Sequence, residues 1–420
     1  MRCLALGMIL FIGSLAAAQD RKKEPPPQGH PGVDPKRVDE AIRRGMEFLK
    51  KAPSPATHKN IPNSDELILL ALVHGGLPQT DPAFREPFDR MLQARFTHTY
   101  KVALQAMILE ELDRVRYQER IAQCAQALVD SQLKHGQWNY ECSTDAVPDT
   151  STATPAAPRS AQSGGKGASK GGPDPLRGTP AQGARPKPPV VRYIPIKRTK
   201  FSPSDRGDNS NSQYAALGLR ACHDAGIVFP QDAVELARKW WETNQQGAKA
   251  GDRPDVATGN RMAAEPRGWD YAKGGTSQEK PFGSMTAGAV SAVVIYDYML
   301  KKDWRQDAVV LSGMAWLNEN FSVTTNPVKY PEWHYYYLYA LERVGMLYNT
   351  WMIGTHDWYR EGANYLLDNQ KADGSWLAGS PFRDAGEKQA TWDTCFAILF
   401  LKRATRSLVD VASVDRGPRK

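Results

Sequence analysis

The sequence predicts an all-α fold, an α/α toroid in which about six helical hairpins close into a ring. The first observation is a turn of the form Gln-x-x-x-Gly-x-Trp, found at residues 370–376 and again at 132–138. The second is that residues 268–271 repeat the glycine, tryptophan and tyrosine of the turn at 132–140. The third is the apolar spacing typical of helices on both sides of these turns. Hairpins of this kind bury their apolar faces only by stacking on neighbouring hairpins.

The turn at 370–376 indicates how one hairpin is built. Asp373 and Gly374 supply a position that tolerates a positive φ where the first helix must end. Trp376 can then fold its indole back over the end of that helix. Residues 358–369 before the turn have apolar side chains at helical spacing, whereas residues 391–401 after it are more continuously apolar. We therefore expect an outer amphipathic helix followed by an inner, more buried one.

The first 18 residues are typical of a secretory signal peptide, with an arginine, an apolar run and three final alanines. We therefore expect an exported protein, secreted or located in the periplasm or cell envelope. No later stretch is long enough for a transmembrane helix. Residues 19–36 are charged and proline-rich, which predicts a disordered leader. The toroid is expected to span residues 37–405, followed by a tail at 406–420.

Apolar periodicity and helix caps place the remaining helices in order. The first hairpin begins near Val38, and Asn63, Ser64 and Asp65 cap its second helix. The helices that follow are expected at residues 84–96, 99–112, 117–133, 211–219, 232–244, 285–300, 305–320 and 333–344.

Residues 145–189 interrupt the third hairpin with an insertion rich in Ser, Thr, Ala, Gly and Pro, a composition that predicts disorder. Residues 151–200 hold ten Lys or Arg against one acid, and the net charge of the whole chain is +8, so the basic character belongs to this region. It is either a tolerated surface insertion or a docking segment for an acidic polymer, a membrane surface or nucleic acid. Residues 138–142 and 190–201, which flank it, are expected to pair as a short ribbon.

Four cysteines follow the signal peptide. Cys124 and Cys395 lie among apolar residues and are expected to be buried thiols, whereas Cys142 and Cys222 bracket the insertion and are candidates for a disulfide. No Cys-x-x-Cys is present, which disfavours redox chemistry and a zinc knuckle.

The turns at 132–138 and 370–376 resemble the repeat of the terpenoid cyclase and protein prenyltransferase superfamily, the squalene cyclase-like α/α toroids. The resemblance covers about residues 38–404 and implies the fold rather than an activity. Class II cyclases of this superfamily protonate an alkene with an Asp-x-Asp-Asp motif at the start of an inner helix. The matching residues here are Asp208, Asn209, Ser210 and Asn211. Only the first acid is kept, and no Asp-Asp-x-x-Asp motif for magnesium occurs, so neither chemistry is favoured.

Protein prenyltransferases, which the chain also resembles, hold catalytic zinc with an Asp-x-Cys pair and a later histidine. Asp393 and Cys395 match the pair, but the last histidine, His356, lies upstream of them. Two ligands do not form a zinc site. We therefore expect Asp393 to cap its helix, Cys395 to pack in the core, and the protein to bind no metal and no cofactor.

The candidate site is the mouth of the ring, where the inner helices begin. Aromatic, amide and acidic side chains gather there, a combination that suits carbohydrate or peptide binding, and toroidal polysaccharide lyases use Tyr and His as base and acid. The candidate binding residues are Trp269, Asp270, Tyr271, Asn211, Gln213, Tyr335, Tyr336 and Trp392. The candidate catalytic residues are Asp208, Asp393 and His334. Taken singly, these residues are also explained as helix caps and as packing between helices.

Two functions are consistent with the sequence. One is an exported binding or scaffold protein that takes an unidentified small-molecule or polymer ligand at the mouth, without the chemistry of the superfamily. The other is an enzyme that acts on an isoprenoid or a polysaccharide in the central cavity. A buried, unpaired carboxylate at the floor of a deep apolar cavity would indicate the enzyme, and a shallow polar mouth would indicate binding.

Overall fold

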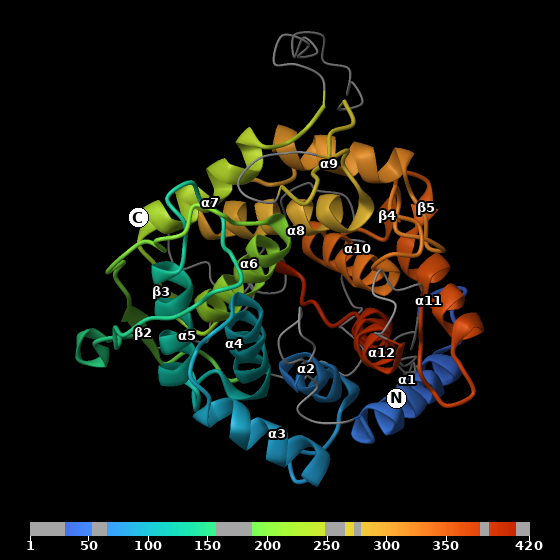
Figure 1. Cartoon of the computed structure of the whole chain (residues 1–420), viewed down its shortest axis with the longest axis horizontal. Coiled ribbons are helices and arrows are strands. Elements are labelled where there is room, and N and C mark those ends of the chain that lie inside the picture. The colour runs from blue at the N-terminus through green and yellow to red at the C-terminus, as the bar shows by residue number, and fades with distance from the viewer. Residues whose placement is uncertain are drawn as a thin grey trace, which may run out of the picture.

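The computed structural model describes residues 30–52, 65–156, 187–247, 265–272, 279–378 and 386–408. Within these residues, α-helices alternate between an outer and an inner layer of one ring (Figure 1). The outer helices are α1 (Pro35–Lys50), α3 (Pro82–Gln93), α5 (Gln118–Asp130), α7 (Gln231–Thr243), α9 (Ala308–Glu319) and α11 (Trp358–Asn369). The inner helices are α2 (Asp65–Gly75), α4 (Thr99–Asp113), α6 (Asn209–Asp224), α8 (Gly283–Met299), α10 (His334–Tyr348) and α12 (Gly386–Lys402).

The inner helices close into a ring. Each packs on the next one along the chain, and α12 packs on α2. The outer helices cover the seams between them: α1 contacts both α2 and α12, and α11 contacts both α10 and α12. The protein is therefore an all-α toroid of six helical hairpins, as the sequence predicts.

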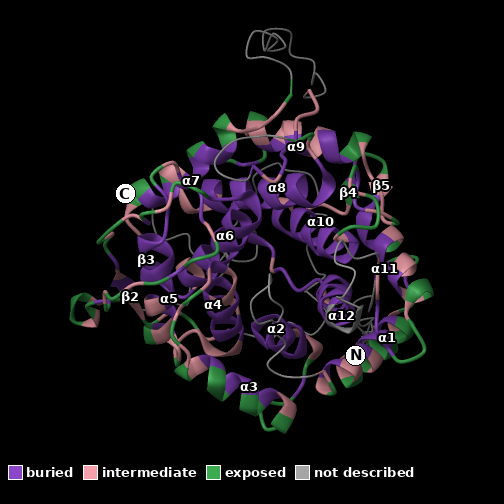
Figure 2. Ribbon diagram, in the orientation of Figure 1, coloured by how far each residue is buried: buried purple, intermediate pink, exposed green. Residues whose placement is uncertain are grey.

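Burial differs between the two layers as the apolar patterns indicate. Every side chain of α8 from Gly283 to Asp297 is buried, whereas the buried residues of α1 recur every three or four positions and form one face. Figure 2 shows this contrast, with buried residues throughout the inner ring and exposed ones on the outer surface of the outer helices. Four outer helices begin with an aspartate whose side chain accepts hydrogen bonds from first-turn N–H groups. These caps are Asp34, Asp81, Asp307 and Asp357.

Short β-strands lie in the segments between some of the helices. After the 3-10 helix η1 (Thr150–Thr152), β1 (Thr154–Pro155) pairs antiparallel with β2 (Arg192–Pro195), which pairs in parallel with β3 (Ile227–Val228). β4 (Met352–Ile353) and β5 (His356–Asp357) form a hairpin before α11. The ribbon predicted between residues 138–142 and 190–201 is wrong in its first strand. Trp138 instead forms an isolated β-bridge with Asp208, the N-cap residue of α6, so the turn at 132–138 contacts the start of that helix.

Two boundaries predicted for the toroid are corrected by packing. The leader was predicted to extend to residue 36, but His30 packs edge-on against Trp351, with ring centroids 4.3 Å apart, and α1 already begins at Pro35. The tail was predicted to begin at residue 406, but the Arg406 guanidinium lies 2.8 Å from Glu111. The signal peptide at 1–18, residues 19–29 of the leader and residues 409–420 of the tail lie outside the described residues.

The insertion predicted at 145–189 also packs in part. Lys187 is nearly buried and forms ion pairs with Glu110 and Glu111, close to the C-terminal end of α4. Residues 157–186 lie outside the described residues, so docking through the basic region 151–200 stays a prediction.

The cysteine pairing is corrected as well. Cys124, Cys142, Cys222 and Cys395 are all buried free thiols, so Cys142 and Cys222 are not bonded to each other. Among the described residues, no helix has the length and apolar character needed to cross a membrane.

Candidate functional site

The mouth of the ring is built by a turn that occurs three times with the same hydrogen bonds. The indole N–H of each tryptophan donates to a carbonyl of the preceding outer helix, at 2.7 to 2.9 Å, and its backbone N–H donates to a hydroxyl of the following inner helix, at 3.1 Å. The sets are Trp138 with Leu128 and Ser212, Trp269 with Trp241 and Thr286, and Trp376 with Leu366 and Thr394. Each tryptophan thereby joins an outer helix to the inner helix that follows it.

The prediction that Trp269 binds a ligand is corrected by this arrangement. Its side chain is fully buried and makes the same two hydrogen bonds as Trp138 and Trp376. Trp269 is therefore part of the packing of the hairpin.

A glutamine at each turn ties its outer helix to the next one. The side-chain amide donates to a carbonyl in the first turns of that helix: Gln132 to Ala233 at 3.0 Å, Gln245 to Val309 at 2.9 Å, and Gln370 to Ala41 at 2.8 Å. Sequence analysis identified the first and last glutamine. It missed Gln245 because residues 246–267 break the short spacing to Gly268 and Trp269.

Glycine is required where the outer helix stops. Gly136 and Gly374 have φ of +104° and +91°, in the region that side chains disfavour. A Cβ at these positions would lie 2.5 Å from the carbonyl oxygens of Leu236 and Arg44, respectively. The turn therefore presses on the neighbouring outer helix, α7 or α1.

The start of α6 is the most polar part of the mouth. The carboxylate of Asp208 accepts from the backbone N–H of Asn211 at 2.7 Å and from its side-chain amide at 2.9 Å. Burial raises the pKa of Asp208 to about 6, against the opposing effect of these hydrogen bonds and of the Tyr271 hydroxyl. Asp208 therefore caps α6. The side chain of neighbouring Asn209 also has a structural role, since its amide donates to the backbone carbonyl of Asp270 at 2.9 Å.

Two tyrosines lie at the solvent side of this cap. Tyr140 and Tyr271 each come two residues after the tryptophan of a turn, and their hydroxyl oxygens lie 2.9 Å apart. Tyr140 is 42% exposed and Tyr271 is half-buried. Tyr271 is one of the predicted binding residues and Tyr140 is not, although both have the same spacing from their tryptophans, Trp269 and Trp138. Asp270, between Trp269 and Tyr271, is buried and accepts from the backbone N–H of Glu279 at 2.8 Å.

In the first turns of α4, α6 and α10, hydroxyl groups meet across the ring. Tyr100 on α4 hydrogen-bonds to Ser210 on α6, and its hydroxyl lies 3.5 Å from that of Tyr336 on α10. Figure 1 shows that α4 and α10 lie on opposite sides of the ring. We call Tyr100, Ser210 and Tyr336 the hydroxyl layer. The hydroxyl layer therefore joins helices on opposite sides of the ring.

The remaining predicted acid, Asp393, lies in α12. Its two oxygens accept from the backbone N–H of Ala378 and the side-chain amide of Gln389, both at 2.8 Å. Burial raises its pKa to about 7. The prediction that Asp393 caps its helix is wrong, because α12 begins earlier, at Gly386. Cys395 and Trp392 are buried. In the described parts of the chain, no group of three or more His, Cys, Asp or Glu residues has the arrangement to hold a metal ion.

His334 is the first residue of α10. Its Nε2 lies 2.9 Å from the carbonyl oxygen of Val323, and burial lowers its pKa to about 4, so it is neutral at pH 7. Tyr335 packs beside it, with ring centroids 5.2 Å apart. No hydrogen bond or ion pair in the described residues joins His334 to Asp208 or Asp393, so the predicted catalytic residues do not form one constellation.

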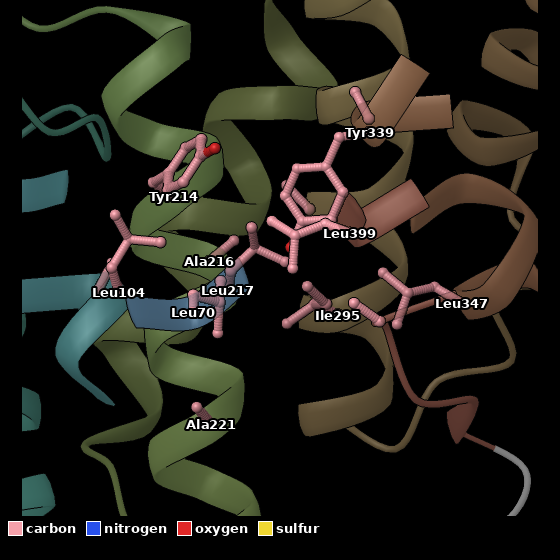
Figure 3. Close-up of a cluster of buried hydrophobic side chains, with 14 of the residues drawn as sticks. Leu70, Leu104, Tyr214, Ala216, Leu217, Ala221, Ile295, Tyr339, Leu347 and Leu399 are labelled. Carbon is pink, nitrogen blue, oxygen red and sulfur yellow. The ribbon is translucent and has the colours of Figure 1, made fainter. Parts of the chain in front are cut away.

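Inside the ring, beyond the hydroxyl layer, one charged side chain lies among aromatic and aliphatic ones. Gln213, predicted at the mouth, accepts a hydrogen bond from Arg343 at 2.6 Å. The ring of Tyr214 stacks on that of Tyr336, with centroids 6.1 Å apart. Figure 3 shows Tyr214 and Tyr339 at one end of a cluster of buried apolar side chains. The labelled members of this cluster from the inner helices include Leu70, Leu104, Leu217, Ile295, Leu347 and Leu399.

Comparison with known proteins adds little to this geometry. No family model matches the chain, and no curated protein matches it. Among solved structures, the chain is similar to the apo form of the type II terpene cyclase MstE from Scytonema. The TM-score is 0.46 with 9% identity, over 88% of this chain and 99% of that one.

Proposed function

We propose that this protein is an exported binding protein that takes a neutral saccharide at the mouth of the toroid and performs no chemistry on it. The observation that carries the proposal is the half-exposed pair of Tyr140 and Tyr271, with hydroxyls 2.9 Å apart above the hydroxyl layer. Aromatic rings offer an apolar face to the C–H groups of a sugar, and their hydroxyls hydrogen-bond its oxygens.

The two predicted acids Asp208 and Asp393 support binding over catalysis. Each oxygen of Asp208 and of Asp393 already accepts a hydrogen bond from the protein. To move a proton, either carboxyl would have to release Asn211 or Ala378 and so loosen the fold around it. An enzyme acting on an isoprenoid or a polysaccharide would need an acid held without such partners.

The charge at the mouth favours an uncharged ligand. The acid whose charge acts on both tyrosines, Asp208, is buried with a pKa raised to about 6. A saccharide without charged groups can bind there without losing the hydration of an ion.

Affinity electrophoresis of the full-length protein through a panel of soluble neutral polysaccharides tests the proposal. We expect at least one of them to retard the wild type. The double variant Tyr140→Ala, Tyr271→Ala should weaken that binding by about 10- to 30-fold. Tyr330→Ala, at a tyrosine 70% exposed elsewhere on the surface, is the control and should bind like the wild type. Equal retardation of the double variant and the control would refute the proposal.

A further inference from the structure

Arg343 is a buried cation with too few partners. It lies on α10 one turn beyond Tyr339, and its side chain is 1% exposed. Nη2 donates to the side-chain oxygen of Gln213 at 2.6 Å, but Nε and Nη1 have no hydrogen-bond partner among the described residues. Since Nε carries one N–H bond and Nη1 carries two, three of its five donors are unmatched.

The surroundings of Arg343 are aromatic. Its Cζ lies 4.5 Å from the ring centre of Tyr339 and 5.7 Å from that of Tyr214, whose hydroxyls also face the guanidinium. Glu342, the next residue along the chain, acts on Arg343 through its charge but makes its hydrogen bonds with Thr405. Its carboxylate accepts from the backbone N–H and the hydroxyl of Thr405, at 2.9 and 2.8 Å.

A second buried arginine, Arg238, differs from Arg343 because carboxylates pair with it. Arg238 is equally enclosed, but its guanidinium lies 2.8 Å from Asp297 and 2.6 Å from Asp307. Arg403, whose Nε and Nη1 are also unmatched, stacks on Trp351 and on Tyr359 of the outer helix α11, away from the hydroxyl layer. A buried charge without a counter-ion is strongly unfavourable. Among the described residues no carboxylate forms an ion pair with Arg343, so its unmatched donors can take an anion from outside the chain.

We propose that Arg343 binds the carboxylate of an apolar organic acid inside the ring. One cation without an acidic partner matches one negative charge, whereas a phosphate dianion or a diphosphate would leave negative charge buried. Tyr214 and Tyr339, whose rings flank Arg343, belong to the cluster of Figure 3 together with buried aliphatic side chains such as Leu217, Leu347 and Leu399, so the body of the acid must be apolar. This site is separate from the saccharide site, because the hydroxyl layer lies between them.

The hydroxyl layer also predicts how the acid reaches Arg343. Tyr336 lies two turns before Arg343 on α10, and its hydroxyl meets those of Tyr100 and Ser210 across the ring. An acid that arrives through the mouth must therefore displace Tyr336 first. We expect slow association with the wild type and faster association with Tyr336→Ala.

Calorimetric and thermal-shift titrations of the full-length protein test the site. Before titration, the protein is unfolded, extracted with organic solvent and refolded, which removes any acid that copurifies. The probes are dodecanoate, dodecanol and dodecyl phosphate, which share a tail and differ in charge. We expect dodecanoate to bind and to raise the melting temperature, with dodecanol and dodecyl phosphate at least tenfold weaker.

The variants separate charge from packing. Arg343→Met should bind dodecanoate about 10- to 100-fold more weakly, the range for losing hydrogen bonds to a charged group. Arg343→Lys keeps the charge and should retain part of the affinity, and Arg238→Lys, at the paired arginine, should bind like the wild type. If Arg343→Met does not refold, the comparison of dodecanoate with dodecanol on the wild type decides the question. Equal affinity for these two probes, or no binding of either, would overturn the proposal. Neither result affects the proposed saccharide binding, which is tested separately with the double variant Tyr140→Ala, Tyr271→Ala.

Discussion

The side-chain amide of Gln370 donates a hydrogen bond to the backbone carbonyl of Ala41 at 2.8 Å, although 329 residues separate them in the chain. The same amide donates to the carbonyl of Gly374 at 2.9 Å. The turn that ends the last outer helix thus also holds the first outer helix. Gln132 and Gln245 make the corresponding contact between neighbouring outer helices, so the contact that repeats around the ring is also the one that closes it.

Gln370→Ala should therefore weaken the whole fold. It leaves the carbonyls of Ala41 and Gly374 without their donor, and we expect the free energy of unfolding to fall by about 1–3 kcal/mol. Urea denaturation measures the loss. The control is Gln231→Ala, at an exposed glutamine whose side-chain amide donates to Glu235 one turn along the same helix. A loss no larger than that of the control would contradict a role for Gln370 in ring closure.

Truncation of the tryptophan of the same turn should be more severe. Trp376 is fully buried and joins Leu366 of α11 to Thr394 of α12. We expect Trp376→Ala to lower the free energy of unfolding by about 3–5 kcal/mol. Trp376→Phe keeps most of the packing but loses the indole donor, so it should cost less. Wild-type melting of Trp376→Ala would show that the indole is not a packing element.

The buried acid Asp393 should make stability depend on pH. Its pKa rises from about 3.8 unfolded to about 7 folded because of burial. The folded state therefore binds the proton more tightly, so stability is greatest below about pH 4 and falls as the pH rises to about 7. The loss from this group is at most about 4 kcal/mol.

Asp393→Asn tests this expectation, because the amide oxygen still accepts from Ala378 but does not ionise. The difference in unfolding free energy between wild type and variant should change between pH 4 and pH 7, in favour of the variant at the higher pH. A difference that stays constant over this range would mean that Asp393 ionises as easily in the folded protein as in the unfolded one.

Removal of residues 157–186 should leave the melting temperature nearly unchanged, because their composition cannot bury a core. The cut must spare Lys187, which pairs with Glu110 and Glu111. We expect Lys187→Ala to lower the free energy of unfolding by about 1–3 kcal/mol. The idea fails if the deletion destabilises the protein as much as Lys187→Ala does.

The ring was predictable from sequence because its turn repeats with fixed chemistry. Gly374 is needed for its positive φ, and Trp376 for its hydrogen bonds to two helices. Gly136 and Trp138 have the same roles in the earlier turn. The site was less predictable because aromatic, amide and acidic residues serve in helix packing as well as in ligand binding. Trp269 was assigned to the mouth by its neighbours, yet it belongs to the packing.

Contacts across the ring could not be derived from local spacing at all. Tyr100 and Tyr336 meet only because α4 and α10 are opposite in a ring of six hairpins. Gln213 was predicted at the mouth and instead contacts Arg343, which no local pattern singles out. Asp393 belongs to the Asp-x-Cys pair noted in the sequence. Its hydrogen-bond partner Ala378 lies 15 positions earlier in the chain, and the motif does not indicate this contact.

The most direct test of the functional account follows binding and turnover of one retarding polysaccharide in the same experiment. Full-length protein is incubated with the polysaccharide, and both retention and the release of new chain ends are measured. We predict saturable retention that falls by about 10- to 30-fold in the double variant Tyr140→Ala, Tyr271→Ala, without any product. Release of chain ends that is lost in Asp208→Asn would contradict the account and identify the protein as an enzyme.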